Sequence, residues 1–390
     1  MSVTAAPGFV AAGGAIGIKP GGAPDVAVVA TADGRPVPAA GVFTANLAAA
    51  APVQVSREHL ERTGRRASAV VLTSGNANAA TGQPGAAAAR QLCAAVAGVV
   101  GSAPEEVLVC QTGLIGVPFP AHVVPGVAAV VASRTGGVDA GAAAARAIMT
   151  TDTVPKEAVA RPDGAGCTVG GMAKGAAMLA PDMATMLAVL TTDALVEPDA
   201  LQRVLADAVA RTFNVLTVDG CTSTNDTVLL LAGGSAGPVE TAALAGAVEE
   251  VCASLARQMA DDAEGATKTA RIAVHGAASD VEAHRAARKV AESLLVKTSL
   301  NGEDPYWGRV VSELGSAGVR FTLGRTTVRY GGIAVCAGGV AVPHDAPAVA
   351  AHMSGRYVEI DCELGIGDGR AAVLTTDLGY GYIDENRTTS

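Results

Sequence analysis

Residues 171–193 read GMAKGAAMLAPDMATMLAVLTTD, and the organisation of the chain is best understood from this stretch outward. Lys174 precedes Thr185 by eleven residues, and Pro181 between them prevents a continuous helix. The aliphatic run that follows, 186–191, predicts a buried strand. Taken alone, Thr185 would be a structural threonine at the start of that strand.

Short aliphatic runs and helical patterns alternate along the whole chain. The runs that predict strands are 26–30, 69–73, 107–110, 186–191, 227–231, 271–275, 328–337 and 357–362. The patterns that predict helices are 85–99, 139–149, 197–212, 238–260 and 280–293. This mixed order favours an α/β or α+β fold in which helices cover sheets.

The composition is that of a globular chain with few aromatic residues. Of 390 residues, 49% are hydrophobic but only 3% are aromatic, so Ala, Val and Leu must fill the core. This length predicts about two or three domains. The net charge is −9 and no basic patch is present, which argues against nucleic acid as a partner because phosphate binding needs such a surface.

The cysteines and the apolar runs indicate where the protein resides. Seven cysteines are scattered without a CxxC spacing, which argues against a disulfide framework or a zinc site and favours reduced, buried thiols. The N-terminus lacks the basic and apolar regions of a signal peptide, and the apolar runs are too short or too interrupted to span a bilayer. We therefore expect a cytoplasmic protein that binds neither a membrane nor a metal.

Hydroxyl, amide and carboxylate residues gather in a few segments between the apolar runs. Outside 171–193, these segments are TSGNANAATG (73–82), QTGLIG (111–116), IMTTDT (148–153), DGCTSTNDT (219–227), DDAEGATK (261–268) and NGEDPYWGR (301–309). One such segment is usually a polar loop, but several together favour a site assembled from loops. The chain has no HExxH, Walker loop or G-x-S-x-G elbow, which disfavours metal, phosphate and serine-hydrolase chemistry.

These segments resemble, in order, the motifs of the ornithine acetyltransferase family, also called glutamate N-acetyltransferases. The clearest match is the K-G-x-G-M-x-x-P-x-x-A-T-M-L stretch of that family at 174–187. The other matches are GVFTAN (41–46), GNANAATG (75–82), TGLIG (112–116), MTTDTVPK (149–156), STNDT (223–227), AEGATK (263–268), LVKT (295–298) and DPYWGR (304–309). The resemblance covers essentially the whole chain.

The resemblance implies that the chain cleaves itself between Ala184 and Thr185. The products would be an alpha chain, 1–184, and a beta chain, 185–390, that begins with the nucleophile Thr185. A threonine hydroxyl needs a base beside it, and an N-terminal threonine supplies its own amine. That amine titrates at about 7.7–8.0, so part of it is neutral at cellular pH.

Other site residues are carried over from the same family motifs. Thr112 and Gly113 match the oxyanion hole, although Gly113 would equally suit a plain turn. The matches to substrate-binding positions are Thr150, Lys174, Thr185, Glu264, Asn386 and Ser390. Lys174 suits a substrate carboxylate and Glu264 suits a substrate ammonium group.

The fold and reaction implied by the resemblance are equally specific. The fold would be a two-layer β-sheet sandwich flanked by helices, N-terminal-nucleophile-like, with a smaller C-terminal α/β region. The reaction would move acetyl from N-acetylornithine to glutamate by a ping-pong mechanism in arginine biosynthesis. It needs no cofactor, although acetyl-CoA is a possible second donor, and the cleaved chains would assemble as an α2β2 heterotetramer.

The sequence also departs from the family pattern. Ala177 replaces a usual Gly, Thr73 and Tyr306 each replace a usual Asn, and the tail after Asn386 is one residue short, which shifts Ser390 out of register. The exact donor and acceptor therefore stay open. The alternatives are an amidase or aminopeptidase with the same nucleophile, an acetyltransferase of specialised metabolism, and a non-enzymatic scaffold, which the joint presence of the site residues disfavours.

Overall fold

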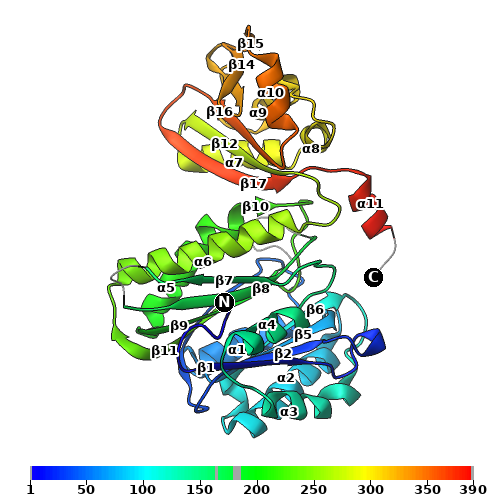
Figure 1. Ribbon diagram of the computed structural model, residues 1–390, viewed down its shortest axis with the longest axis vertical. Helices are drawn as coiled ribbons and strands as arrows, with labels where there is room; N and C mark the ends of the chain where they lie inside the picture. Colours follow the sequence, from blue (N-terminus) through cyan, green and yellow to red (C-terminus); the bar gives the residue numbers. More distant parts are fainter. Residues whose placement is uncertain (1, 163–165, 179–185, 388–390) are drawn as a thin grey trace. The chain divides into compact units, whose positions relative to one another are not determined.

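The computed structural model describes residues 2–162, 166–178 and 186–387, and the chain forms two compact units (Figure 1). Unit 1 comprises Met1–Asn214 and Thr222–Met259, and unit 2 comprises Val215–Cys221 and Ala260–Ser390. The products expected from cleavage, 1–184 and 185–390, do not coincide with these units. Strand β8 (Val169–Lys174) precedes the expected cleavage point and pairs with β9 (Leu187–Leu195), which follows it. The two products would therefore share one sheet.

Within the described residues, unit 1 contains two sheets. The first has the order β1-β2-β5-β6, with strands β1 (Phe9–Gly14), β2 (Val26–Thr31), β5 (Ala69–Asn76) and β6 (Val107–Leu114). The second has the order β4-β3-β11-β9-β8-β7, and its other strands are β3 (Val37–Phe43), β4 (Arg66–Ala67), β7 (Lys156–Ala160) and β11 (Thr227–Pro238). The pairs β5·β6 and β9·β11 are parallel.

Alternating residues of the strands explain how these sheets stack. Ala27 and Val29 of β2 lie in the same core cluster as Met172, Leu187 and Leu229 of the second sheet. The intervening Val26 and Val28 pack with the helices on the opposite face. Successive side chains of a strand point to opposite faces, so the first sheet has a face toward the second sheet and a face toward helices.

Helices cover the outer faces of both sheets (Figure 1). Helices α2 (Gly82–Val100) and α3 (Val124–Ala132) pack on the first sheet, while α5 (Pro198–Arg211) and α6 (Thr241–Asp261) pack on the second. Helix α4 (Val138–Ala147) packs against β1, β2 and β8. The result is the expected two-layer sheet sandwich flanked by helices.

Side chains of helix α1 (Ala51–Arg62) contact backbone N–H and C=O groups of the edge strand β6. Ser56 Oγ donates to Val109 O at 2.7 Å and accepts from Val109 N–H at 2.8 Å. His59 Nδ1 contacts Val107 O at 2.8 Å. These side chains occupy backbone groups that an edge strand would otherwise leave unpaired in the interior.

Unit 2 contains, within its described residues, a mixed sheet of order β10-β17-β12-β16-β13-β14-β15. Its strands are β10 (Leu216–Thr217), β12 (Thr269–Ala277), β13 (Thr327–Tyr330), β14 (Ile333–Ala337), β15 (Val340–Ala341), β16 (Tyr357–Glu363) and β17 (Gly369–Thr376). Its helices are α7 (Asp280–Ala291), α8 (Leu294–Asn301), α9 (Trp307–Ser316), α10 (Ala346–Met353) and α11 (Tyr380–Asn386). It is the smaller C-terminal α/β region that the resemblance implied.

The expected elements are present with one exception. The range 328–337 was expected to be one strand, but the structure has a hairpin of β13 and β14 there. Gly331 and Gly332 form its turn with φ of 56° and 81°, a conformation that glycine adopts without strain. In the portion of the chain that the structure describes, no helix is long and apolar enough to cross a membrane.

Candidate active site

The end of β6 carries the expected oxyanion-hole pair. Thr112 is buried, whereas Gly113 is exposed and has a φ of 129°. A Cβ on Gly113 would lie 2.3 Å from the carbonyl carbon of Gly75 in β5, so no other residue fits without moving that strand. The interpretation of Gly113 as a plain turn is therefore wrong. It is a strand residue fixed by the close approach of β5.

A buried amide network supports this strand end from behind. Gln111 Nε2 donates to Thr73 Oγ1 at 3.1 Å, and Gln111 Oε1 accepts from Asn78 Nδ2 at 2.8 Å. Asn225 Nδ2 donates to the backbone carbonyl oxygens of Ala77 at 2.6 Å and Gln111 at 2.9 Å. Because buried polar groups are costly unless they are hydrogen-bonded, this satisfied network fixes the strand that carries Thr112.

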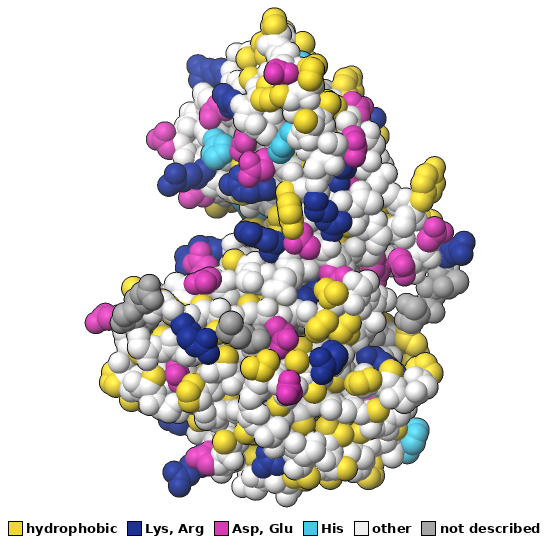
Figure 2. Space-filling model, in the orientation of Figure 1, with side chains coloured by type: hydrophobic (Ala, Val, Ile, Leu, Met, Phe, Trp, Pro, Cys, Tyr) yellow, Lys and Arg dark blue, Asp and Glu magenta, His cyan; other side chains and the backbone are white. Residues whose placement is uncertain are grey.

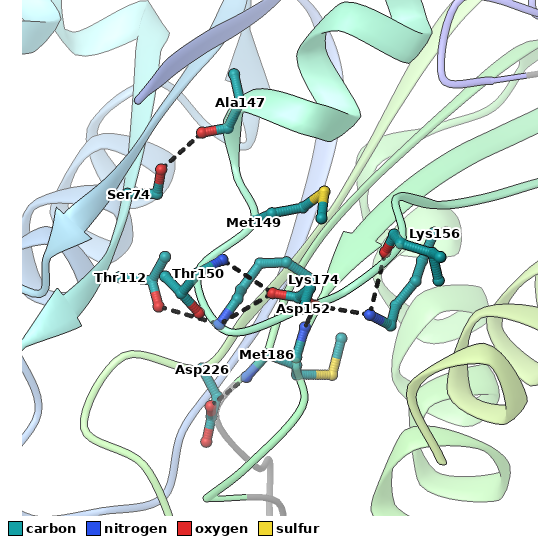
Figure 3. Close-up of polar contacts among 12 residues, drawn as sticks. Ser74, Thr112, Ala147, Met149, Thr150, Asp152, Lys156, Lys174, Met186 and Asp226 are labelled. Atoms are coloured by element: carbon teal, nitrogen blue, oxygen red, sulfur yellow. Dashed lines mark hydrogen bonds and ion pairs between the residues drawn. The ribbon is translucent and has the colours of Figure 1, made fainter. Parts of the chain in front are cut away.

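Three buried charged side chains meet beside Thr112 (Figure 3). Lys174, the last residue of β8, places its Nζ 3.5 Å from Thr112 Oγ1 and 3.8 Å from Asp152 Oδ2. Asp152 Oδ1 accepts from Lys156 Nζ at 2.7 Å and from Gly175 N–H at 2.7 Å. Lys174 and Lys156 therefore share one carboxylate, and we call Asp152, Lys156 and Lys174 the charge cluster.

The charge cluster keeps Asp152 ionised. Burial alone would raise the pKa of this carboxyl, but the ammonium groups of Lys174 and Lys156 and the Gly175 N–H together hold it below its ordinary value. Such a shift is expected for a carboxylate that has both cations and hydrogen-bond donors around it. The cluster thus contains one negative and two positive side chains.

The loop before Asp152 is held from two sides. Ser74 Oγ donates to Ala147 O at 2.6 Å (Figure 3). Lys19 Nζ donates to Met149 O at 2.6 Å. Burial lowers the pKa of Lys19. Thr150, an expected substrate-binding residue, donates its backbone N–H to Asp152 Oδ2 at 3.0 Å. Thr112, Thr150 and Lys174 are therefore brought together in unit 1.

Asp226 lies at the start of β11, opposite the start of β9. Its Oδ1 accepts from Met186 N–H at 2.9 Å, while its buried Oδ2 has no hydrogen-bond partner among the described residues. Burial raises the pKa of this carboxyl well above its ordinary value, although the Met186 N–H and the Lys174 charge oppose that change. Asp226 thus fixes the residue that directly follows Thr185.

The remaining expected residues fall elsewhere. Glu264 and Asn386 belong to unit 2, where Asn386 Nδ2 donates to Glu264 Oε2 at 2.6 Å. Ala184, Thr185 and Ser390 lie outside the described residues. Among the residues that are described, no group of three His, Cys, Asp or Glu side chains could hold a metal ion.

The departures from the family pattern have ordinary local roles. Thr73 accepts from Gln111 within the buried network. Ala177 does not have a positive φ, so a Cβ is tolerated there. Tyr306 is exposed on unit 2, with the Arg309 guanidinium carbon 5.8 Å from its ring centroid.

Several residues of this site were not predicted from the sequence. They are Gln111, Asp152, Lys156, Asn225 and Asp226. All five lie inside polar segments already noted, at 111–116, 149–156 and 223–227. The one local signal was the four-residue spacing of Asp152 and Lys156, because their other partners are distant in sequence.

Comparison with known proteins identifies the family of this chain. The sequence model of the ArgJ family matches residues 10–388. The "Arginine biosynthesis bifunctional protein ArgJ" of Mycolicibacterium paratuberculosis is 48% identical over 100% of this chain and 96% of its own length. The protein of the same name from Streptomyces coelicolor is 46% identical, with 100% of both chains covered.

Solved structures of related proteins are also similar in sequence. Ornithine acetyltransferase from Mycobacterium tuberculosis, solved with ornithine, is 45% identical over 46% of this chain and 94% of the solved chain, with a TM-score of 0.43. ArgJ from Bacillus halodurans is 34% identical over 50% and 96%, with a TM-score of 0.49. The match of the family over nearly the whole chain confirms the resemblance seen in the motifs, and the chain belongs to the ArgJ family.

Proposed function

We propose that this chain is a self-processing acetyltransferase that moves acetyl from N2-acetylornithine to glutamate in arginine biosynthesis. The observation that carries the proposal is a pair of consecutive residues. Asn225 binds the carbonyl oxygen of Gln111, the neighbour of Thr112, and Asp226 binds the N–H of Met186, the neighbour of Thr185. The STNDT segment is thus hydrogen-bonded both to β6, which carries the expected oxyanion hole, and to the residue just before β9, which follows the expected nucleophile.

The first chemical event is cleavage of the chain. The Thr185 hydroxyl attacks the carbonyl carbon of Ala184, the hydroxyl proton moves to the Thr185 nitrogen, and an ester forms as the amide bond breaks. Water then hydrolyses the ester, which leaves a carboxylate on Ala184 and a free amine and hydroxyl on Thr185. The free amine afterwards serves as the base for that hydroxyl.

Acetyl transfer then follows in two half-reactions. Thr185 takes acetyl from N-acetylornithine and releases ornithine, and the glutamate amine takes acetyl from the threonine ester. Each half passes through a tetrahedral oxyanion, for which Thr112 and Gly113 are the proposed donors. Loss of one such donor typically lowers kcat by about 10²–10³-fold.

The amino-acid substrate would be recognised through its charges. Thr150, Lys174, Glu264, Asn386 and Ser390 are the proposed binding residues, with Lys174 for a carboxylate and Glu264 for the ornithine ammonium. The proposed enzyme is cytoplasmic, uses no cofactor, accepts acetyl-CoA as a possible second donor, and assembles from cleaved chains as α2β2.

Cleavage is the first test of this function. Intact mass spectrometry of the wild-type protein should give two chains, the second beginning at Thr185. Thr185→Ala should remain one chain of 38.4 kDa and lose all transfer, because both steps need the hydroxyl. Thr191→Ala is a matched control, since Thr191 is a buried threonine of β9 whose hydroxyl bonds Val3 O. A second chain that begins elsewhere would contradict the proposal.

Substrate choice is the second test. Wild type should transfer acetyl to glutamate much faster from N-acetylornithine than from N-acetyl-leucine, because a site built for an ammonium group rejects an analogue without one. Glu264→Gln should reduce this difference in transfer rate, because the variant would bind N-acetylornithine more weakly. Equal use of both donors would argue for an acetyltransferase of specialised metabolism. Free acetate that appears faster than acetylglutamate would favour the amidase alternative.

A further inference from the structure

The hydrogen bond between Lys174 and Thr112 has a defined direction. An ammonium group has three donors and no acceptor, so Thr112 Oγ1 must accept at the 3.5 Å contact with Lys174 Nζ. The hydroxyl hydrogen of Thr112 is then directed away from Lys174 and can donate to another oxygen. A hydroxyl that accepts from a cation is also a stronger donor, because the charge polarises its O–H bond.

We propose that Lys174 is a positioning residue of the oxyanion hole, which acts by polarising and orienting the Thr112 hydroxyl, with Asp152 and Lys156 holding it in place. This inference rests on the proposed function. It gives Lys174 a role in the transition state, separate from the binding of a substrate carboxylate that the family resemblance implies. The two roles are distinguishable because only one of them needs a substrate with a carboxylate.

The charges of the cluster support this role. Lys156 lies 2.7 Å from the shared carboxylate of Asp152, whereas Lys174 lies 3.8 Å from it. Lys156 thus makes the shorter contact with the Asp152 carboxylate, and Lys174 is the cation of the cluster that contacts Thr112 (Figure 3). The side chains of Asp152 and Lys156 are fully buried and that of Lys174 is 3% exposed, so water screens this charge weakly.

The position of Lys174 is also rigid. It ends β8, pairs in register with Leu187 of β9, and is followed by Gly175, whose N–H donates to Asp152. Asp152 therefore holds the backbone just after Lys174 as well as its ammonium group. Preorganised charge of this kind stabilises an oxyanion without rearrangement during the reaction.

The test uses an acetyl donor that has no carboxylate. Acylation of the mature enzyme by p-nitrophenyl acetate needs the oxyanion hole but offers nothing for Lys174 to bind. Since a lost oxyanion donor costs about 10²–10³-fold, Lys174→Met should slow this acylation by about 10–10²-fold. It should also slow self-cleavage of the freshly made chain, which uses no amino-acid substrate. An unchanged ester rate, with only the KM for N-acetylornithine raised, would overturn the proposal.

A double-mutant cycle shows whether Lys174 acts through Thr112. In a Thr112→Ala background, Lys174→Met should cost less than threefold in ester acylation, because the hydroxyl that it polarises is already gone. If the rate loss of the double variant equals the product of the two single-variant losses, Lys174 acts independently of Thr112 and the proposal is overturned. Lys174→Gln keeps a donor without the charge and replaces Lys174→Met if thermal melting shows that the latter does not fold.

A matched control separates these effects from loss of any lysine. Lys289 is half-exposed on unit 2, where it pairs with Glu313 at 3.3 Å, and Lys289→Met should acylate as wild type does.

Failure of this inference can be distinguished from failure of the proposed function. If wild type neither cleaves nor transfers acetyl, the proposed function fails. If wild type does both and Lys174→Met retains ester acylation and self-cleavage, only this inference fails.

Discussion

Each unit contains a buried lysine, Lys156 in unit 1 and Lys297 in unit 2, and the two ammonium groups have different kinds of hydrogen-bond partner. In unit 1, Lys156 is completely buried and donates to the carboxylate of Asp152 at 2.7 Å. In unit 2, Lys297 is also buried, and its hydrogen-bond partners among the described residues are uncharged oxygens. Its Nζ donates to Thr375 Oγ1 at 2.9 Å and to the backbone carbonyl and hydroxyl oxygens of Thr376.

The difference appears in the ionisation of the two sites. The charge cluster of unit 1 lowers the pKa of Asp152 and so stays ionic. In unit 2, burial lowers the pKa of Lys297 to about 8, although Asp377, Asp219 and Glu292 act in the opposite direction. Burial therefore lowers the proton affinity of Lys297, whereas the cations and donors in contact with Asp152 keep that carboxylate ionised. In surface view, positive and negative side chains are otherwise interspersed (Figure 2).

Removal of the carboxylate should have the largest effect on stability. Asp152→Asn leaves Lys156 and Lys174 close together without their anion, and breaking a buried ion pair in this way costs about 3–5 kcal/mol. Urea denaturation of the uncleaved Thr185→Ala chain, with and without Asp152→Asn, measures this loss. Asp33→Asn is the control, because Asp33 is exposed and such pairs contribute at most about 1 kcal/mol. A similar loss in both variants would mean that the charge cluster is not ionic.

The lysine of unit 2 should instead show itself in the pH dependence of stability. The pKa of Lys297 is lower in the folded chain than its ordinary value of 10.5, so between about pH 8 and 10.5 the unfolded chain binds more protons. Wild-type stability should therefore rise through that range by about 3 kcal/mol from this residue, at 1.36 kcal/mol per pKa unit. Lys297→Met should remove the rise.

The measurement compares denaturation curves of wild type and Lys297→Met at several pH values from 7 upward. The difference between the two curves isolates Lys297, because other groups titrate in both proteins. Lys289→Met, on the surface of the same unit, should leave the wild-type slope intact. A slope that persists in Lys297→Met would show that burial does not lower the proton affinity of Lys297.

Much of the fold was predictable because strands and helices carry local patterns. Aliphatic runs such as that of β2 and amphipathic patterns such as that of α5 are visible in any short window. Strand β8 was missed because it contains Gly170 and Gly171, which suggest a loop. A Cβ at Gly170 would lie 2.4 Å from Ser2 O, so the glycine is required by a distant segment. Helix α1 was missed for a similar reason, since its buried face contains Ser56 and His59, which are polar.

The site was predictable only where family motifs name single residues. The resemblance named Thr112, Gly113, Thr150 and Lys174, and the structure brings Thr112, Thr150 and Lys174 close together around Asp152. The hydrogen bond of Asp226 to Met186 spans 40 residues of sequence, and that of Asn225 to Gln111 spans 114. No local pattern encodes such pairs, because they exist only after both sheets have formed.

The smallest predicted effect concerns Asp226, a buried carboxyl of unit 1 that, unlike Asp152, has no ion pair among the described residues. Burial raises the pKa of Asp226 in the folded chain, so the folded state holds its proton more tightly than the unfolded state does. The stability from this proton is fully present below the ordinary pKa of 3.8 and is lost as pH rises through the folded pKa. Asp226→Asn mimics the protonated form, since its amide oxygen can still accept from Met186 N–H.

Asp226→Asn should therefore melt at the same temperature as its parent at low pH and at a higher temperature near neutral pH. A gain of about 1 kcal/mol would raise Tm by about 2–4 °C in a domain of this size. The parent is the uncleaved Thr185→Ala chain, and Asp199→Asn, at an exposed ion pair with Arg65, is the control that should show no such pH-dependent gain. A variant that is less stable than its parent at neutral pH would mean that the Asp226 carboxylate has a cationic partner. Asp226 would then follow the rule of Asp152, and the contrast between paired and unpaired buried charges would no longer hold within unit 1.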